Sequence, residues 1–251
     1  MNKKINLSNI PLIPLFSILM VLFVMVTVVV MELTEDSDVA EPTENITEAV
    51  EATEETMEPI LVGGDVMDLG FDLKLHSFDT YAGIFMEDGS DEIVTNVARV
   101  LLTNQSQEDL QYAQITVTYA DEVCNYTVTN LPAGASVVLL EQARKPLPEG
   151  EPVAVTVDNV AFFQAPMNPH KDVIEISGVS GIMNVKNVSD TDITGDIYVY
   201  YKYTAANLYY GGITFRVRVQ GGLGAGQIHQ GVTTHFDPDR CTIVDVAILE
   251  P

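Results

Sequence analysis

The sequence contains no tryptophan, only two cysteines, and 12 basic residues against 36 acidic ones in 251 residues. Two cysteines are too few for a disulfide scaffold or a Cys-rich zinc module. A formal net charge of −24 excludes ordinary nucleic-acid binding, which requires a basic surface. The chain is nonetheless 47% hydrophobic, so it is not an acidic disordered protein throughout.

Charge and hydropathy divide the chain into three parts. Residues 1–31 contain two lysines and no acid, whereas residues 32–59 contain 11 acids and no base. Residues 60–251 hold the other 25 acids and 10 bases, a net charge of −15. Each part therefore needs its own interpretation.

The strongest single feature is an uncharged run from Ile10 to Met31, in which only Ser17 and Thr27 are polar. A helix of this length spans about 33 Å, enough for a hydrocarbon core of about 30 Å. Two lysines precede the run and acids follow it, so the positive-inside rule places residues 1–9 in the cytoplasm and the rest outside. We predict an uncleaved, single-pass transmembrane anchor at residues 10–31 in the cell membrane.

A cleaved signal peptide and a buried core helix remain alternatives to this anchor. Cleavage requires small residues just after the apolar core, and the first alanine after the run is Ala40.

The acidic residues 32–59 are predicted to form a disordered linker. Like charges at this density, without any aromatic residue, cannot bury enough apolar surface to offset the entropy of chain ordering. A marginal helix around Ile46–Thr53 and an acidic binding tail are the alternatives.

After Pro59 the hydrophobic period is two, which is typical of antiparallel strands with one buried face. Apolar or aromatic residues alternate with polar ones over residues 113–119 and 215–220. Clusters of Asn, Gly, Asp and Pro separate the short runs, as in β-sandwiches. We therefore predict an all-β fold without amphipathic helices.

Short patterns recur in the same order at an interval of 82 to 92 residues. They predict two tandem sandwich modules, 60–165 and 170–251, each of ordinary domain size. The matched segments are Asn104-x-Ser106 with Asn187-x-Ser189, Ile115-x-Val117-x-Tyr119 with Ile197-x-Val199-x-Tyr201, Leu131–Gly134 with Leu223–Gly226, and Val157–Ala161 with Val244–Ala247.

An Asn-x-Ser turn, an I-x-V-x-Y strand and a Leu-x-x-Gly turn together resemble the FxLYD-type modules. The resemblance covers about 90–163 and 173–249, and Ile197–Tyr201 is the nearest approach to the Phe-x-Leu-Tyr-Asp signature. It implies extracytoplasmic immunoglobulin-like sandwiches of the bacterial envelope, and it brings no catalytic residues.

The sequence gives only weak evidence for a metal site. His229 and His235 share one face of an extended segment, but six residues separate them by about 20 Å. Asp190–Gly195 resembles the start of a calcium loop, yet the twelfth position is Tyr201 rather than glutamate. The acidic segment 87–92 is better explained as a hairpin turn, so no metal or other cofactor is predicted.

The sequence gives equally little evidence for a catalytic site. Residues 221–226 read GGLGAG, which lacks dinucleotide-binding spacing and a following helix. No G-x-S-x-G or H-E-x-x-H motif and no Cys–His nucleophile spacing occurs in the sequence. We therefore predict a protein that is not an enzyme. Whether Cys124 and Cys241 form a disulfide remains open.

The alternation that buries Ile197, Val199 and Tyr201 places the intervening side chains on the outer face of the predicted second module. Tyr and Arg are enriched at binding hot spots, and Arg can stack on Tyr. A candidate interaction surface therefore consists of Tyr198, Tyr200, Lys202, Arg216 and Arg218. A purely structural role in the sheet is the alternative.

Taken together, the sequence predicts a membrane-anchored structural or interaction protein of the cell envelope. Its modules would bind another envelope protein or support assembly. A ligand-binding sensor acting through a signalling partner is the alternative, followed by an envelope enzyme.

Overall fold

The computed structural model describes residues 66–249. This part of the chain is all-β, as predicted, and none of its residues forms a helix. Accordingly, no helix within these residues is long and apolar enough to cross a membrane. The predicted anchor at 10–31 and linker at 32–59 lie outside the described residues.

Within residues 66–249 there are thirteen strands, joined by turns and by two longer connections, β6 to β7 and β7 to β8. We call β1 to β7 the N-terminal half. Its strands are β1 (Met67–Asp68), β2 (Leu73–Ile84), β3 (Ile93–Asn104), β4 (Leu110–Thr118), β5 (Val123–Leu131), β6 (Ser136–Leu140) and β7 (Ala154–Phe162). The C-terminal half contains β8 (Ile174–Val179), β9 (Ile182–Asn187), β10 (Asp196–Ala205), β11 (Leu208–Val219), β12 (Ile228–Val232) and β13 (Cys241–Leu249). The predicted division between residues 165 and 170 falls in the connection from β7 to β8.

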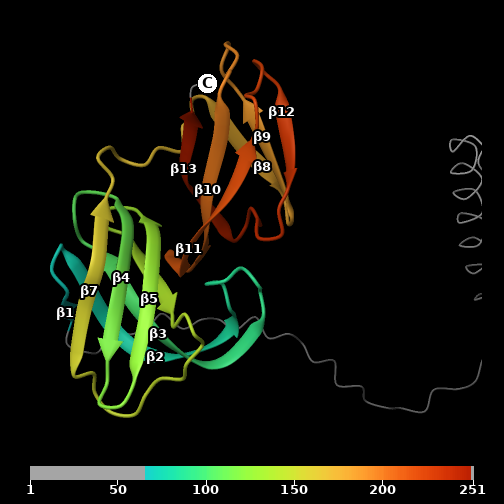
Figure 1. Ribbon diagram of the computed structural model, residues 1–251. Helices are drawn as coiled ribbons and strands as arrows, with labels where there is room; N and C mark the ends of the chain where they lie inside the picture. The colour runs from blue at the N-terminus through green and yellow to red at the C-terminus, as the bar shows by residue number, and fades with distance from the viewer. Residues whose placement is uncertain (1–65, 250–251) are drawn as a thin grey trace, which may run out of the picture. The chain divides into compact units, whose positions relative to one another are not determined.

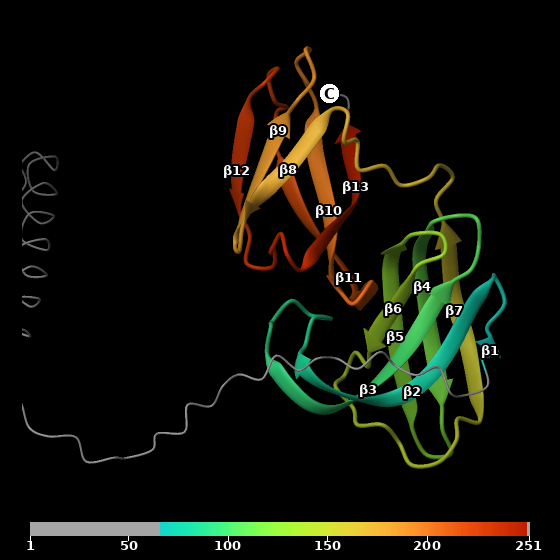
Figure 2. The same ribbon diagram turned by 180° about the vertical axis from the view of Figure 1, so that it is seen from behind.

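Each half has two layers, which Figures 1 and 2 show from opposite sides. In the N-terminal half, the antiparallel strands β5, β4 and β7 pack against β1, β2, β3 and β6. In the C-terminal half, β11, β10 and β13 pack against β12, β9 and β8. If β1 is set aside, the two halves have the same strand order in both layers.

One sheet runs through both halves. Its order is β1-β2-β3-β6-β11-β10-β13, and the only parallel neighbours in it are β6 and β11. These two strands pair through Tyr209 with Val137 and Tyr210 with Val138. The end of the β10–β11 hairpin therefore continues the sheet of the N-terminal half.

The alternating side chains form the cores as predicted. Ala113, Ile115 and Val117 of β4 are fully buried, and so are Ile197 and Val199 of β10. A third cluster joins the halves at the β10–β11 hairpin; its buried members are Tyr81, Phe85, Met86, Val97, Leu101, Val138, Leu140 and Tyr210.

A buried asparagine closes a turn in the N-terminal half. The Asn104 side-chain amide donates to the carbonyl oxygens of Glu108 (3.0 Å) and Leu131 (3.2 Å). Its side-chain oxygen accepts hydrogen bonds from the Ser106 backbone N–H and hydroxyl. Asn104 thus satisfies backbone groups that burial would otherwise leave unpaired.

The C-terminal half contains the same arrangement. The Asn187 amide donates to the carbonyl oxygens of Thr191 (2.8 Å) and Leu223 (2.9 Å), and its oxygen accepts from both Ser189 groups. The two asparagines found by sequence comparison therefore do the same structural work.

Candidate functional site

The predicted aromatic and basic side chains lie on neighbouring strands of the C-terminal half. In the β10–β11 ladder, Tyr198 is opposite Arg218 and Tyr200 is opposite Arg216. The two tyrosines are half-buried and both arginines are exposed. We call these four residues the Tyr–Arg face.

Both arginines of the face contact the same ring. The guanidinium of Arg216 lies 5.1 Å from the centre of the Tyr198 ring, and that of Arg218 lies 5.7 Å from it. The Arg218 Nε also donates to the Asp196 carboxylate at 2.9 Å. The Gly221 N–H and the Arg218 guanidinium lower the pKa of Asp196. These contacts hold the side chains of the face in position.

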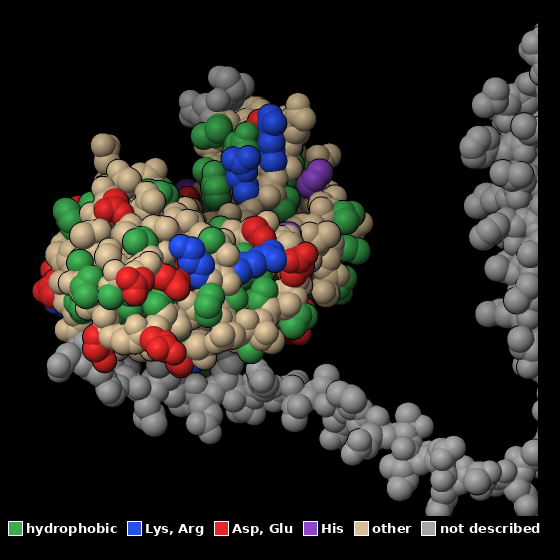
Figure 3. All heavy atoms as spheres, turned by 60° about the horizontal axis from the view of Figure 1, so that its bottom comes forward, with side chains coloured by type: hydrophobic (Ala, Val, Ile, Leu, Met, Phe, Trp, Pro, Cys, Tyr) green, Lys and Arg blue, Asp and Glu red, His purple; other side chains and the backbone are tan. Residues whose placement is uncertain are grey.

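Figure 3 shows basic side chains interspersed with acidic and hydrophobic ones on the face that it displays.

The structure contradicts the prediction for Lys202. This residue lies where the β10–β11 register shifts, and its side chain is fully buried. Its Nζ donates to the carbonyl oxygens of Thr129 (3.0 Å), Gly212 (2.9 Å) and Ile213 (2.7 Å). The prediction was wrong because β5 of the N-terminal half covers this end of β10, a contact that local alternation does not report.

A buried carboxylate lies on the other side of the Gly212 peptide. Glu87 accepts hydrogen bonds from the backbone N–H groups of Leu140 (3.0 Å) and Gly212 (2.9 Å). Burial raises the pKa of Glu87 and lowers the pKa of Lys202 to about 7. The three carbonyl oxygens around Nζ match the three N–H bonds of an ammonium group, and they oppose the effect of burial without cancelling it.

Gly212 makes this close contact between the halves sterically feasible. A Cβ atom at Gly212 would lie 1.6 Å from the Thr129 carbonyl oxygen. The Thr129 hydroxyl is 2.9 Å from that of Thr214 and donates to the Gly212 carbonyl. The sequence analysis did not identify this contact between Gly212 and Thr129. A Gly-Gly pair inside a strand of β-branched and aromatic residues does indicate that another backbone approaches closely.

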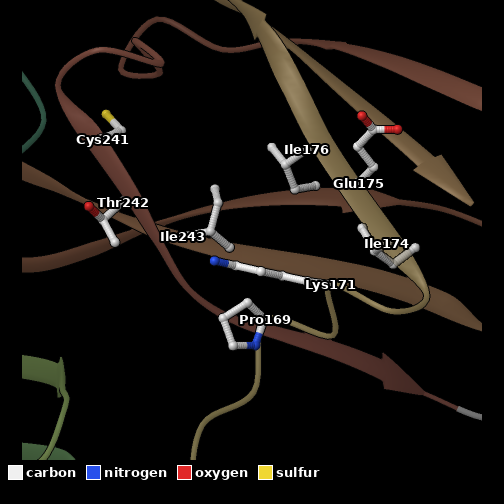
Figure 4. Close-up of a pocket in the computed structure, with 8 residues that line it drawn as sticks. All are labelled: Pro169, Lys171, Ile174, Glu175, Ile176, Cys241, Thr242 and Ile243. Carbon is white, nitrogen blue, oxygen red and sulfur yellow. The ribbon is translucent and has the colours of Figure 1, made fainter. Parts of the chain in front are cut away.

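A cleft of about 440 Å³ lies between β8 and β13. Figure 4 shows apolar side chains from both strands on its walls and the Lys171 amine extended across one end. Its lining residues are Pro169, Lys171, Ile174, Glu175, Ile176, Cys241, Thr242 and Ile243. Sequence reasoning had not singled out this cleft.

The acidic residues of segment 87–92 and the side chain of His235 lie beside other charged groups. Arg144 pairs with the carboxylates of Asp88 and Glu92, and His235 Nδ1 lies 3.1 Å from the Asp91 carboxylate. Within residues 66–249, no group of three or more His, Cys, Asp or Glu side chains has a geometry that could hold a metal ion. The acidic turn is thus part of an ion-pair network.

Both cysteines are free thiols. Cys124 is buried in the core of the N-terminal half and Cys241 is half-buried beside the cleft. Burial raises the pKa of both thiols, which lowers their reactivity.

No protein-family model, curated protein or solved structure matches the chain.

Proposed function

We propose that this is a single-pass membrane protein of the cell envelope that presents tandem immunoglobulin-like modules outside the membrane for protein binding and assembly. The uncharged run at residues 10–31 and its charge asymmetry support the anchor. The equal strand order of the two halves and their equivalent asparagine turns support tandem modules.

The observation that carries the binding role is the Tyr–Arg face. Its exposed arginines are held over a half-buried tyrosine ring. Fixed aromatic and guanidinium groups lose little side-chain entropy on binding, and they are the types that dominate binding hot spots. The face thus offers a partner an ordered surface.

The binding role is tested with Tyr198→Thr/Arg216→Thr in the full chain. After chemical cross-linking in membranes, we expect the double variant to lose the cross-linked partner bands that the wild-type chain gives. Its melting temperature should stay within about 2 °C, because partly exposed side chains contribute little to stability.

The matched control is Thr116→Ala/Thr118→Ala on β4, the strand equivalent to β10 in the N-terminal half. Partner bands that persist in the Tyr198→Thr/Arg216→Thr variant, or a loss of folding in it, would show that the face is structural. Loss of the same bands in the control would place binding elsewhere.

The anchor is tested separately by N-terminal sequencing of protein extracted from membranes. We expect the sequence to begin at or near Met1. A new N-terminus between residues 30 and 45 would show cleavage and contradict the anchor.

A further inference from the structure

The two halves differ at one equivalent edge. Leu73 of β2 pairs with Asn104, and Ile174 of β8 pairs with Asn187, so β2 and β8 occupy the same position relative to the repeated asparagine. The outer side of β2 carries the short strand β1. Within residues 66–249, no strand pairs with the outer side of β8.

The residues before β8 take another path. The Asn168 N–H donates to the Asp245 carboxylate (2.8 Å), and the Asn168 carbonyl accepts from the Val246 N–H (3.0 Å). This segment therefore lies along β13 and leaves β8 uncovered. Pro169, the next residue, has no N–H to donate to a ladder.

The uncovered edge opens the core. Leu75 of β2 is 1% exposed, whereas Ile176, at the equivalent position in β8, is only half-buried. Figure 4 shows Ile174, Ile176 and Ile243 around the resulting cleft. In the N-terminal half, Met67 and Leu69 pack against the core at the corresponding edge.

The backbone of β8 is oriented to accept another strand. The Val188 N–H donates to the Val173 carbonyl, so the backbone of Val173 points toward β9. In an antiparallel ladder every second residue does the same, so the backbone N–H and C=O groups of Glu175 and Ser177 also point toward β9. The backbone N–H and C=O groups of Ile176 therefore point to the open edge. In the N-terminal half, the equivalent groups of Leu75 point to β1. An extended segment with inward apolar residues would complete both the ladder and the core.

The chain contains such a segment. Residues 60–65, Ile-Leu-Val-Gly-Gly-Asp, repeat the pattern of residues 67–72, Met-Asp-Leu-Gly-Phe-Asp, at an interval of seven. Both have two apolar residues two positions apart, then glycine, then Asp three positions after the second apolar residue. Residues 67–69 form and extend the strand that covers β2.

We infer that residues 60–65 of a second copy of this chain add to β8 as an antiparallel strand, as β1 adds to β2. Ile60 and Val62 then face Ile176 and Ile174, and Leu61 points outward. Pro59 directs its nitrogen away from β8, which is the arrangement that an edge strand tolerates.

Charge supports this direction of pairing. An antiparallel strand brings its C-terminal end to the start of β8, where Lys171 extends into the cleft. Within residues 66–249, the Lys171 amine has no hydrogen bond or ion pair. Asp65, which follows two glycines in the sequence, supplies a carboxylate for this amine.

Chain length selects a second copy rather than the same chain. β1 and β13 are opposite edges of the seven-stranded sheet, and the path along the sheet between them is about 29 Å at the usual spacing of ~4.8 Å per strand. The cleft lies beyond that distance, at β13. The seven steps from Ile60 to Met67 extend at most about 25 Å. The segment of one chain therefore does not reach its own β8.

This inference rests on the proposed assembly role and names a second copy as one partner. It uses an edge that is distinct from the Tyr–Arg face. A wild-type chain that does not self-associate but still captures partners through the face would overturn this inference alone.

The experiment measures self-association of the full chain in detergent by sedimentation velocity over a range of concentrations. Ile60→Lys/Val62→Lys damages the segment, and Ile176→Lys damages the cleft. We expect each to weaken self-association roughly tenfold or more, because buried apolar contacts are lost. Leu61→Lys, which changes the outward side chain, is the matched control and should associate like the wild type.

Mixing then tests exchange between copies. The Ile60→Lys/Val62→Lys chain keeps an intact cleft, and the Ile176→Lys chain keeps an intact segment. An equimolar mixture of the two should therefore regain dimers. A mixture that stays monomeric would overturn the proposal, as would variants that associate as well as the wild type or a Leu61→Lys chain that is equally impaired.

A milder pair guards against misfolding of Ile176→Lys. Asp65→Lys and Lys171→Glu each place like charges together, and mixing the two chains restores an opposite pair. We expect the mixture to associate more tightly than either chain alone. Equal association in all three samples would contradict the pairing.

Discussion

The two halves of the described chain share a framework and differ at its borders. Both have the same order of six strands, and both close a turn with a buried asparagine. The N-terminal half covers its edge with β1, whereas the C-terminal half leaves β8 open and has arginines on its outer face. Buried positions thus define the shared fold, while edges and outer faces distinguish what each half can bind.

The largest effect is expected where the halves meet. Gly212→Ala places a methyl group 1.6 Å from the Thr129 carbonyl oxygen, which cannot move without disturbing β5. We expect a loss of about 3 kcal/mol or more in the free energy of unfolding, measured with denaturant.

Gly224→Ala is the control for that substitution. Its new methyl group meets only the flexible end of Gln227, so the cost should be under about 1 kcal/mol. Equal costs at the two glycines would show that the halves can separate slightly without penalty.

The asparagine turns test whether the halves are energetically alike. Asn104→Ala and Asn187→Ala each remove the buried side-chain hydrogen bonds that close the turn, and each should cost about 2 kcal/mol. Thermal unfolding of both variants measures the comparison. A substantial cost in only one half would show that the shared geometry does not have a shared energetic role.

The buried lysine makes stability depend on pH. Burial lowers the pKa of Lys202 to about 7, against 10.5 for the unfolded chain. Between these values the unfolded state binds more protons, so the free energy of unfolding rises with pH, by at most about 1.4 kcal/mol per unit.

Lys202→Met should remove that contribution. Denaturant titrations from pH 7 to 10 compare the two chains, and the difference isolates Lys202 from tyrosines and thiols common to both. Parallel profiles would contradict the role of Lys202.

The sequence predicted the parts of the fold that depend on local pattern. Alternation identified the buried faces of β4 and β10, because one side of each strand faces its own core. The repeated Asn-x-Ser identified both turns, since the side-chain bonds are mostly local.

The failures share one cause, which is contact between distant segments. Alternation placed Lys202 on an exposed face, but the side chain is buried and bonds to Thr129 of β5. The match of Val157 with Val244 was also wrong: Val117 pairs with Val155, and its counterpart Val199 pairs with Val246. A short Val-Asp pattern is too common to fix register across a bulged strand.

Smaller effects are expected on the Tyr–Arg face. Arg218→Met removes the ion pair with Asp196, whose arginine side chain is 49% exposed. Exposed ion pairs contribute little to stability, so the free energy of unfolding should change by under about 0.5 kcal/mol. A loss as large as that at the asparagines would mean that the face serves mainly to hold the sheet together.

Hydrogen exchange at the two equivalent edges tests the central comparison most directly. In dilute full-length protein, the amide of Ile176 should exchange rapidly while that of Leu75, which faces β1, stays protected. Raising the protein concentration should slow exchange at Ile176 and leave Leu75 unchanged, because a second copy then covers β8. Equal protection of the two amides when dilute, or no change at Ile176 with concentration, would contradict the account.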